Sequence, residues 1–311
     1  MPNLTNPVVP QELLVVGAAL QAGLFDAIRE EPCTLDELAT KLGFDLRALW
    51  TVNEALISQG YLNFNDNKYS LTVEAEEILF AEESDKYIGN ALIHTFNVIK
   101  SWTQIPEVLK TGAPVPKERT QQDIKGFMAA MKRSAKQLAD EITAVCLRDL
   151  PKGAKVLDLG GGPLNYARPF AAAGAEVTVQ DLPGVCQIME KNLSPDENIK
   201  FAPGDFTREV IAGQFDLAFL GSITHIYGKE ENIALFKRIH NVLKPGGRIV
   251  ISDFVRGVSA RAELFAVNML VNTKTGGTWT LKQYTDWLEQ AGYRGIKMHQ
   301  VKDRQLIIAQ A

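Results

Sequence analysis

Near its middle the chain reads Val156-Leu-Asp-Leu-Gly-Gly-Gly-Pro-Leu-Asn-Tyr-Ala167. The apolar first part predicts a buried strand, which ends in Asp158 and a run of three glycines. Glycine has no Cβ, so the backbone of such a loop can pass close to a ligand. The residues that follow predict the start of a helix. This stretch therefore predicts a strand, a ligand-binding loop and a helix in succession.

Strand and helix patterns alternate from this stretch to the end of the chain. Helices are expected between the first six strands, and this alternation predicts an α/β, doubly wound, Rossmann-like sheet. The last two strands are joined by residues 301–303, a link too short for a parallel crossover, so the last strand is expected to be antiparallel. The seven predicted strands lie near residues 154–159, 176–180, 199–202, 215–221, 247–254, 295–300 and 304–309.

The N-terminal part has a different, mostly helical pattern. Residues 11–30 have helical apolar spacing, and Thr34 with Glu37 predicts a capping box for a helix that ends at Gly43. A further helix is expected from Asp45 to Gly60, followed by a hairpin of residues 61–64 and 68–71. This order predicts a winged helix. The sequence predicts helices over residues 85–150, most clearly over 127–142, with a loop at 111–117.

We therefore expect a winged-helix dimerisation domain over residues 1–110, linking helices that contribute to the substrate pocket over 111–150, and a ligand-binding domain over 151–311. Winged helices often bind DNA, which requires several Lys or Arg to neutralise phosphates. The helix that would enter DNA, residues 45–59, has Arg47 as its only cation. Dimerisation is the favoured role.

Composition narrows the class of protein further. The 311 residues are 46% hydrophobic and carry a net charge of -4, which gives no sign of a nucleic-acid partner. Cys33, Cys146 and Cys186 are scattered and form no disulfide framework or zinc site, so no metal is expected. We find no signal peptide and no apolar run long enough to span a bilayer. The expectation is a cytoplasmic protein without a membrane partner.

Three acids lie at the ends of three successive predicted strands. They are Asp158, then Asp181 in Val177-Thr-Val-Gln-Asp-Leu-Pro183, then Asp205 in Pro203-Gly-Asp-Phe206. An ammonium group, a ribose diol and an adenine amine would each suit one acid, and S-adenosylmethionine has all three. Each motif also has a plainer interpretation: a strand-to-helix turn, a helix N-cap at Asp181, or a turn with a core aromatic at Phe206. A dinucleotide is disfavoured, because Asp158 would repel a pyrophosphate and the spacing of a third glycine is missing.

His225 follows the fourth predicted strand, in Phe219-Leu-Gly-Ser-Ile-Thr-His-Ile-Tyr-Gly228. Ligands of parallel sheets bind outside the carboxyl ends of the strands, and a histidine there can serve as a general base near neutral pH. A structural role for His225 is the alternative.

These motifs together resemble the plant-type O-methyltransferases and their bacterial relatives, such as hydroxyneurosporene and polyketide O-methyltransferases. The resemblance covers nearly the whole chain and implies a homodimer formed through the N-terminal domain. The matching segments are Leu24-Phe-Asp-Ala-Ile28, Thr34-Leu-Asp-Glu-Leu-Ala39, Tyr69-Ser-Leu-Thr72, Asp158-Leu-Gly-Gly-Gly162, Asp181-Leu-Pro183, Gly204-Asp-Phe206, Leu243-Lys-Pro-Gly-Gly247 and Ala291-Gly-Tyr293.

The resemblance implies S-adenosylmethionine as methyl donor and a small-molecule acceptor, aromatic or polyketide-like, that is methylated on a hydroxyl. His225 would be the catalytic base and Asp253 would orient it. The expected cofactor contacts are Asp158, Gly160, Gly162, Asp181, Leu182, Asp205, Phe206, Ser222 and Tyr227. The expected acceptor contacts are Met128, Met131, Phe265, Asn268, Asn272 and Trp279.

The chain departs from the family pattern at four places. Ile226-Tyr227 follows the histidine in place of Asp-Trp, and Thr278-Trp279-Thr280 stands in place of Glu-Arg-Thr, which removes a second acidic partner of the histidine. Leu164 replaces a glycine, and Gly221 replaces a Lys or Arg four residues before the histidine. Two alternatives therefore stay open: C-methylation or non-methylating chemistry with the same cofactor, and a ligand-sensing winged-helix regulator.

Overall fold

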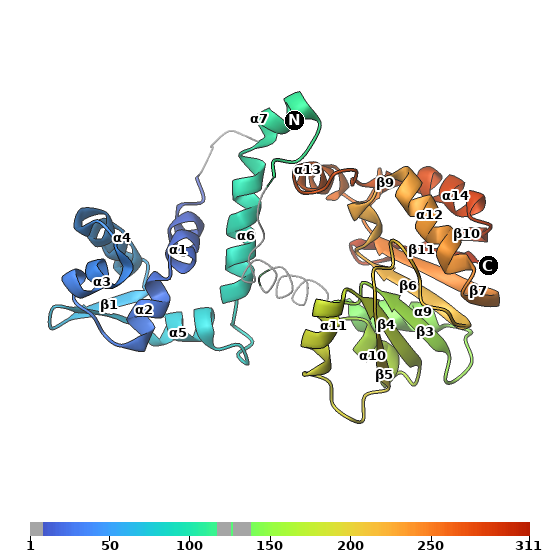
Figure 1. Cartoon of the computed structure of the whole chain (residues 1–311), viewed down its shortest axis with the longest axis horizontal. Coiled ribbons are helices and arrows are strands. Elements are labelled where there is room, and N and C mark those ends of the chain that lie inside the picture. The colour runs from blue at the N-terminus through green and yellow to red at the C-terminus, as the bar shows by residue number, and fades with distance from the viewer. Residues whose placement is uncertain (1–8, 117–125, 127–137) are drawn as a thin grey trace. The chain divides into compact units, whose positions relative to one another are not determined.

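The structure, a computed structural model, describes residues 9–116, 126 and 138–311. The chain divides into two compact units (Figure 1). Unit 1 comprises Met1–Lys100 and Glu118–Ala130, and unit 2 comprises Ser101–Lys117 and Met131–Ala311. Each unit has its own hydrophobic core. The segment predicted as linking helices, 111–150, is thus shared between the two units.

Unit 1 begins with two helices where the sequence predicted one. Residues 11–30 form α1 (Gln11–Gln21) and α2 (Leu24–Glu30), which are bent by 63°. The prediction of a single helix is wrong because Gly23 adopts a left-handed conformation with φ 73°, which ends the first helix. Within the described ranges, no single helix is long and apolar enough to cross a membrane, and only this bent pair together meets that test of length and composition.

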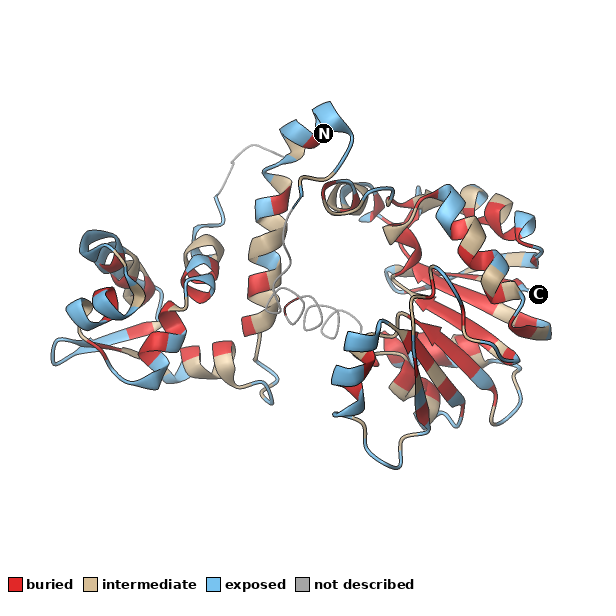
Figure 2. Cartoon of the chain, viewed as in Figure 1, coloured by how far each residue is buried: buried red, intermediate tan, exposed pale blue. Residues whose placement is uncertain are grey.

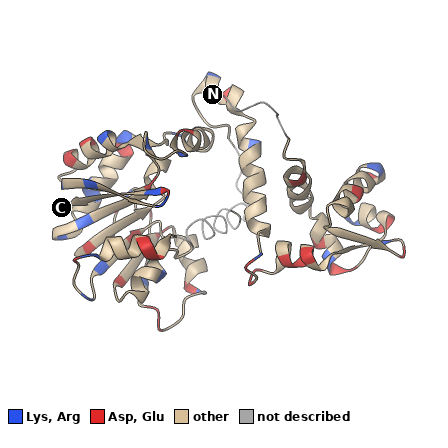
Figure 3. Ribbon diagram, turned by 180° about the vertical axis from the view of Figure 1, so that it is seen from behind, with Lys and Arg blue, Asp and Glu red and all other residues tan. Residues whose placement is uncertain are grey.

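The next elements of unit 1 follow the predicted order. They are α3 (Leu35–Leu42), α4 (Leu46–Ser58), the hairpin β1 (Leu62–Asn65) and β2 (Lys68–Leu71), α5 (Val73–Phe80) and most of α6 (Gly89–Trp102). The capping box of Thr34 and Glu37 is confirmed, and Asp45 accepts a hydrogen bond from the backbone N–H of Ala48 at 2.9 Å. Basic and acidic residues both occur along the ribbon of this unit (Figure 3). The winged-helix assignment stays a prediction.

Unit 2 contains the predicted seven-stranded sheet, in the order β10-β11-β7-β6-β3-β4-β5. Strands β3 to β7 run parallel, while β11 is antiparallel to both β7 and β10, which confirms the expected reversal. The strands are β3 (Lys155–Leu159), β4 (Glu176–Asp181), β5 (Ile199–Pro203), β6 (Phe215–Gly221), β7 (Leu243–Asp253), β10 (Arg294–Val301) and β11 (Arg304–Gln310). Two further short strands, β8 (Val255–Arg256) and β9 (Trp279–Thr280), pair with each other.

The helices of unit 2 surround this sheet, but one predicted helix is absent. The described helices are α7 (Ile105–Thr111), α9 (Ala139–Leu147), α10 (Ala167–Ala172), α11 (Pro183–Glu190), the 3-10 helix η1 (Thr224–Ile226), α12 (Lys229–His240), α13 (Ala262–Asn272) and α14 (Leu281–Gln290). The prediction of a helix between β5 and β6 is wrong. There the side chains of Asp205 and Gln180 satisfy backbone groups of Thr207, Glu209 and Ile211, so the segment forms a single turn at Asp205 and does not continue as a helix.

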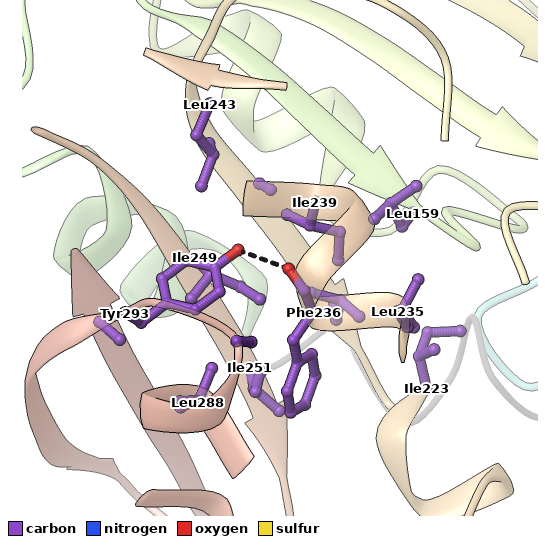
Figure 4. Close-up of a cluster of buried hydrophobic side chains, with 14 of the residues drawn as sticks. Leu159, Ile223, Leu235, Phe236, Ile239, Leu243, Ile249, Ile251, Leu288 and Tyr293 are labelled. Carbon is purple, nitrogen blue, oxygen red and sulfur yellow. Dashed lines mark hydrogen bonds between the residues drawn. The ribbon is translucent and has the colours of Figure 1, made fainter. Parts of the chain in front are cut away.

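The core of unit 2 fixes the strand ends that carry the candidate site. The central strands are buried over most of their length (Figure 2), as expected for a parallel sheet covered on both faces. Figure 4 shows side chains of β3, β7 and α12, with Ile223 from the turn after β6, packed with Leu288 and Tyr293 from α14 and the turn after it. The Tyr293 hydroxyl donates to the Phe236 carbonyl at 3.1 Å, which ties this turn to α12.

Candidate active site

The glycine loop after β3 is tightly enclosed. The backbone N–H of Gly160 donates to the carbonyl of Gln180 at 2.8 Å, and this anchors the loop to β4. Gly160 has φ 68°, and a Cβ on it would lie only 2.4 Å from Ile223 Cδ1. A side chain would therefore meet both backbone strain and a collision. The position needs glycine on two independent grounds.

Asp158 lies directly beneath this loop. It is 1% exposed, and a Cβ on Gly161 would come within 2.7 Å of its Oδ2 atom. Burial, together with the nearby charge of Asp181, raises the pKa of Asp158 to about 7. In the described part of the chain Oδ2 has no hydrogen-bond partner. A buried carboxylate oxygen without a hydrogen-bond partner lowers the stability of the protein unless a ligand supplies that partner. The ammonium of an amino acid is a suitable partner.

Asp181, at the end of β4, joins the loop from the other side. Its Oδ2 accepts the backbone N–H of Gly162 at 3.0 Å, and its Oδ1 accepts that of Leu182 at 2.7 Å. Burial raises the pKa of Asp181, although these two N–H groups act in the opposite direction. Leu182 itself is 52% exposed next to the carboxylate.

The third acid, Asp205, is placed just after β5. The backbone N–H of Gly204 donates to the Asp181 carbonyl at 2.9 Å, so the ends of β4 and β5 are held together. Asp205 accepts the hydroxyl of Thr207 at 2.6 Å, and this bond is the main cause that lowers the pKa of Asp205. Phe206 is 7% exposed, with Cε1 3.4 Å from the position of a Gly160 Cβ.

Tyr227 links these acids electrostatically. Burial raises the pKa of its hydroxyl to about 12, and the negative charges of Asp205, Glu231 and Asp181 act in the same direction. The carboxyl ends of β3, β4 and β5, which are neighbours in the sheet, thus bring the three predicted acids to one edge.

His225 and Asp253 form a buried pair beside this edge. His225 Nδ1 lies 2.8 Å from Asp253 Oδ1 and 3.0 Å from Oδ2, and Asp253 is fully buried. Burial alone would raise the pKa of Asp253, but His225, the charge of Arg304 and the Phe254 N–H together lower it. The carboxylate is therefore an acceptor, the proton of a neutral His225 ring sits on Nδ1, and Nε2 carries the free lone pair.

Two residues that the sequence analysis missed complete this pair. Thr224 Oγ1 donates to Asp253 Oδ2 at 2.9 Å and lies 2.7 Å from the hydroxyl of Tyr284 on α14. Because the single hydroxyl proton of Thr224 goes to Asp253, Tyr284 must donate to Thr224. No sequence signal joins residues 60 positions apart; only the packing of α14 brings them together.

The turn that carries His225 is held from three sides. Asn232 Nδ2 donates to the carbonyls of Thr224 and Tyr227 at 3.0 and 2.9 Å, and the Gly277 N–H donates to the carbonyl of His225 at 2.9 Å. Trp279 Nε1 donates to the Thr224 carbonyl at 3.3 Å. These bonds fix the backbone of η1 and with it the direction of the imidazole.

Three predicted acceptor contacts share one face of α13. Phe265 places its ring edge-on to His225 with centroids 4.8 Å apart, and Asn268 and Asn272 follow at i+3 and i+7. Asn268 Oδ1 accepts the indole N–H of Trp102 and the side-chain amide of Asn272, each at 3.0 Å. This face therefore lies beside the imidazole.

The other predicted acceptor contacts are placed differently. Met128 and Met131 lie outside the described residues. Trp279 packs against Trp287 with ring centroids 5.2 Å apart and lines a cavity of about 480 Å³. The described residues that line this cavity come from α12, α14 and the loop before β9, and none of the other predicted contacts is among them.

The predicted cofactor residue Ser222 directly follows β6, has φ 60° and accepts a hydrogen bond from Arg304 Nη1 at 3.3 Å. Among the residues that the structure describes, no group of His, Cys, Asp and Glu is arranged to hold a metal ion.

A parallel sheet with this strand order, an antiparallel closing strand and a glycine loop between acids defines an S-adenosylmethionine-dependent methyltransferase. The chain belongs to the O-methyltransferase family: the model of the O-methyltransferase domain matches residues 112–294, more than half of the chain. The enzyme is thus an O-methyltransferase that uses S-adenosylmethionine.

Relatives align with nearly the whole chain. The tetracenomycin polyketide synthesis 8-O-methyl transferase TcmO of Streptomyces glaucescens is 25% identical over 298 residues, which are 90% of this chain and 87% of that one. Acetylserotonin O-methyltransferase of Gallus gallus is 24% identical over 310 residues, 91% and 89% of the two chains. An L-tyrosine C(3)-methyltransferase of Streptomyces lavendulae is 24% identical over 260 residues, 76% and 69% of the two chains.

Solved structures share the fold. PigF, determined with SAH, superposes with a TM-score of 0.76 at 22% identity and covers 97% of this chain and 96% of its own. Human N-acetylserotonin methyltransferase, determined with SAM, gives a TM-score of 0.69 at 22% identity over 96% of this chain and 94% of its own.

Proposed function

We propose that this enzyme methylates a hydroxyl of a small aromatic or polyketide-like acceptor, with His225 as the general base. The observation that carries the proposal is the buried bond of 2.8 Å from His225 Nδ1 to Asp253, beside the acid-lined edge of the sheet. Relatives that act on polyketide, naphthoate and acetylserotonin acceptors support the acceptor class.

The glycine loop and the three acids are the proposed cofactor site. S-adenosylmethionine, when bound, supplies a methyl group on a positively charged sulfur. We assign Asp158, under the loop, to an ammonium, and Asp181, held by Gly162, to hydroxyl donors. Asp205 and Phe206 would take an adenine amine and ring, and Leu182, Ser222 and Tyr227 would line the same site.

His225 would act on the acceptor hydroxyl. The acceptor oxygen forms a bond to the methyl carbon while the carbon–sulfur bond breaks, and the hydroxyl proton passes to His225 Nε2. Asp253 holds the ring through Nδ1 and stabilises the imidazolium that forms. A phenol has a pKa of about 10, so a base is useful at neutral pH. Holding the oxygen in line supplies a further part of the rate enhancement.

The acceptor is proposed to lie along the face of α13 next to the imidazole. Phe265 offers a ring edge, and Asn268 and Asn272 offer amides one turn apart. Met128, Met131 and Trp279 stay predicted acceptor contacts.

A panel of phenolic acceptors, with S-adenosylhomocysteine as the measured product, tests the proposal. We expect H225A to lose about 10²–10⁴-fold in kcat while it keeps its affinity for S-adenosylhomocysteine. Turnover at the wild-type level in H225A, on an acceptor that the wild type methylates, excludes His225 as the base.

Carbon methylation is a second candidate. The relative from Streptomyces lavendulae is an L-tyrosine C(3)-methyltransferase, so alignment over most of the chain extends to a carbon-methylating enzyme. Both products release S-adenosylhomocysteine, so the position of the new methyl group decides between them. An O-methyl signal in the NMR spectrum of the product supports the first candidate, and a ring C-methyl signal supports the second.

We also propose that unit 1 mediates homodimerisation. Leu46 and Trp50, one turn apart on α4, are 46% and 51% exposed, and a second copy would cover them. We expect W50E to shift the sedimentation coefficient from dimer to monomer, and R47E on the same helix to leave the dimer intact. A monomeric wild-type protein contradicts this role.

A further inference from the structure

The guanidinium of Arg304 lies at the site edge and is not used by the proposed chemistry. Arg304 opens β11, where Gln305 is paired with Asp253 of β7. Its side chain lies over the ring of Phe254, with the guanidinium carbon 4.0 Å from the ring centroid, and reaches Ser222 Oγ at 3.3 Å. Arg304 thus crosses the end of β7 and arrives at the end of β6.

Charged neighbours of Arg304 in the β10–β11 hairpin are paired, and Arg304 is not. Lys302 pairs with Glu141 at 2.6 Å, and Asp303 with Arg261 at 3.6 Å. In the described part of the chain Arg304 makes the one hydrogen bond to Ser222 and no ion pair. A guanidinium has five N–H donors in a planar fork, so most of its capacity for a carboxylate remains open.

Tyr166 connects this cation to the glycine loop. Its ring packs on Phe219 with centroids 4.7 Å apart, and a Cβ on Gly221 would lie 2.9 Å from Tyr166 Cε2. The charges of Asp158 and Arg304 both act on the Tyr166 hydroxyl, in opposite directions. Because β3 and β6 are neighbours in the sheet, Asp158 near the end of β3 and Arg304, which reaches Ser222 just after β6, lie at the same edge.

We propose that Arg304 binds the α-carboxylate of the methionine part of S-adenosylmethionine. An amino acid head group carries an ammonium and a carboxylate on one carbon, and this edge offers a carboxylate and a guanidinium. Phe254 and Ser222 hold the guanidinium in place, so little side-chain freedom is lost on binding. This assignment rests on the proposed cofactor site and adds a residue that the sequence analysis did not single out.

Binding calorimetry with two nucleosides tests the assignment. The probes are S-adenosylhomocysteine and its decarboxylated analogue, which lacks only the α-carboxylate. We expect the wild type to prefer the carboxylated probe. In R304Q the affinity for that probe should fall roughly 10- to 100-fold, while the affinity for the decarboxylated analogue is kept, so the preference collapses. R304K, which keeps the charge without the fork, should retain part of the preference.

R261Q is the matched control, because it removes a 73% exposed arginine side chain that contacts the same hairpin. It should bind both probes like the wild type. An equal loss for both probes in R304Q means a purely structural role and overturns the assignment. Unchanged binding of both probes, with a higher KM for a carboxylated acceptor, moves the guanidinium to the acceptor and also overturns it. A wild type that binds neither probe overturns the proposed function itself.

Discussion

The hydroxyls of Thr224 and Tyr284 lie 2.7 Å apart in the core of unit 2, and both side chains are fully buried. Tyr284 donates to Thr224, which in turn donates to Asp253, the residue that orients His225. A chain of three hydrogen bonds thus runs from α14 to the proposed base.

This network predicts an order of effects for two substitutions. T224V removes a donor to Asp253 and leaves the Tyr284 hydroxyl without its acceptor, so it should reduce the free energy of unfolding by about 1–3 kcal/mol. Y284F removes only the outer bond and should cost about 0.5–1.5 kcal/mol. Urea unfolding of both variants and of the double variant measures this. We expect the double variant to be less destabilised than the sum of the two, since the residues are in contact; strict additivity contradicts a coupled chain.

Asp253→Asn should prevent His225 from acting as a base but leave the binding of the nucleoside intact. An amide in place of the carboxylate can donate to His225 Nδ1, and the proton of the neutral ring then moves to Nε2, where it blocks proton uptake. We expect kcat to fall by about 10²–10⁴-fold. Affinity for S-adenosylhomocysteine should stay unchanged, because among the residues that the structure describes Asp253 binds only Thr224, His225 and Phe254. A variant that keeps wild-type kcat shows that the orientation of His225 is not needed.

Alanine substitutions at two glycines of the same loop should destabilise the protein to different extents. In Gly160→Ala the residue has a positive φ and the new Cβ lies 2.4 Å from Ile223 Cδ1. The substitution should lower the free energy of unfolding by about 2–5 kcal/mol and weaken nucleoside binding. Gly162→Ala meets φ 44° and nothing closer than 3.8 Å, so it should cost only about 1–2 kcal/mol. Thermal unfolding compares the two. I223A in the G160A background should recover part of the loss by relieving the contact, and no recovery contradicts this cause.

The free energy of unfolding should depend on pH through the ionisation of Asp158. The pKa of this acid rises from 3.8 to about 7 on folding, so the folded state binds more protons between these values. Without ligand, stability should therefore fall as pH rises from about 4 to about 7, and D158N should lack this component. Denaturant midpoints over this range measure the difference between the two proteins.

If the ammonium of the ligand binds beside Asp158, the affinity for the ligand should change with pH in the opposite direction to stability. Because the ammonium favours the ionised carboxylate, affinity for S-adenosylhomocysteine should increase with pH toward about pH 7, by at most about tenfold per unit. D158N should bind more weakly and lose the increase. A wild-type affinity that is flat with pH, measured by calorimetry, contradicts an ammonium at this acid.

Leu164 offers a test of backbone strain. It has φ 62° and is 1% exposed, so a left-handed position that suits glycine is filled by a buried leucine. L164A should lower the free energy of unfolding by about 2–5 kcal/mol, because buried contacts are lost and the backbone strain remains. L164G loses one more methyl group but relieves about 1–2 kcal/mol of strain, so it should be no less stable than L164A. Chemical unfolding gives the ranking, and a clearly less stable L164G means that the backbone is unstrained.

Local patterns determined much of this protein. The seven apolar strands, the capping box at Thr34 and the antiparallel last strand, expected from the short link before it, depend on short stretches of sequence, and each was confirmed. Acids at the carboxyl ends of successive parallel strands reach one sheet edge because the strands share a direction. The sequence could not show the missing helix before β6, because its backbone groups are satisfied by Gln180, more than 25 residues earlier in the chain.

Only the tertiary structure decided the partners of those residues. Thr224 and Tyr284, Arg304 and Ser222, and Gly160 and Ile223 are far apart in the sequence and meet because the sheet and α14 pack around one core. Hydrogen bonds and steric contacts act over a few ångströms, and the folded chain alone sets which distant side chains come that close.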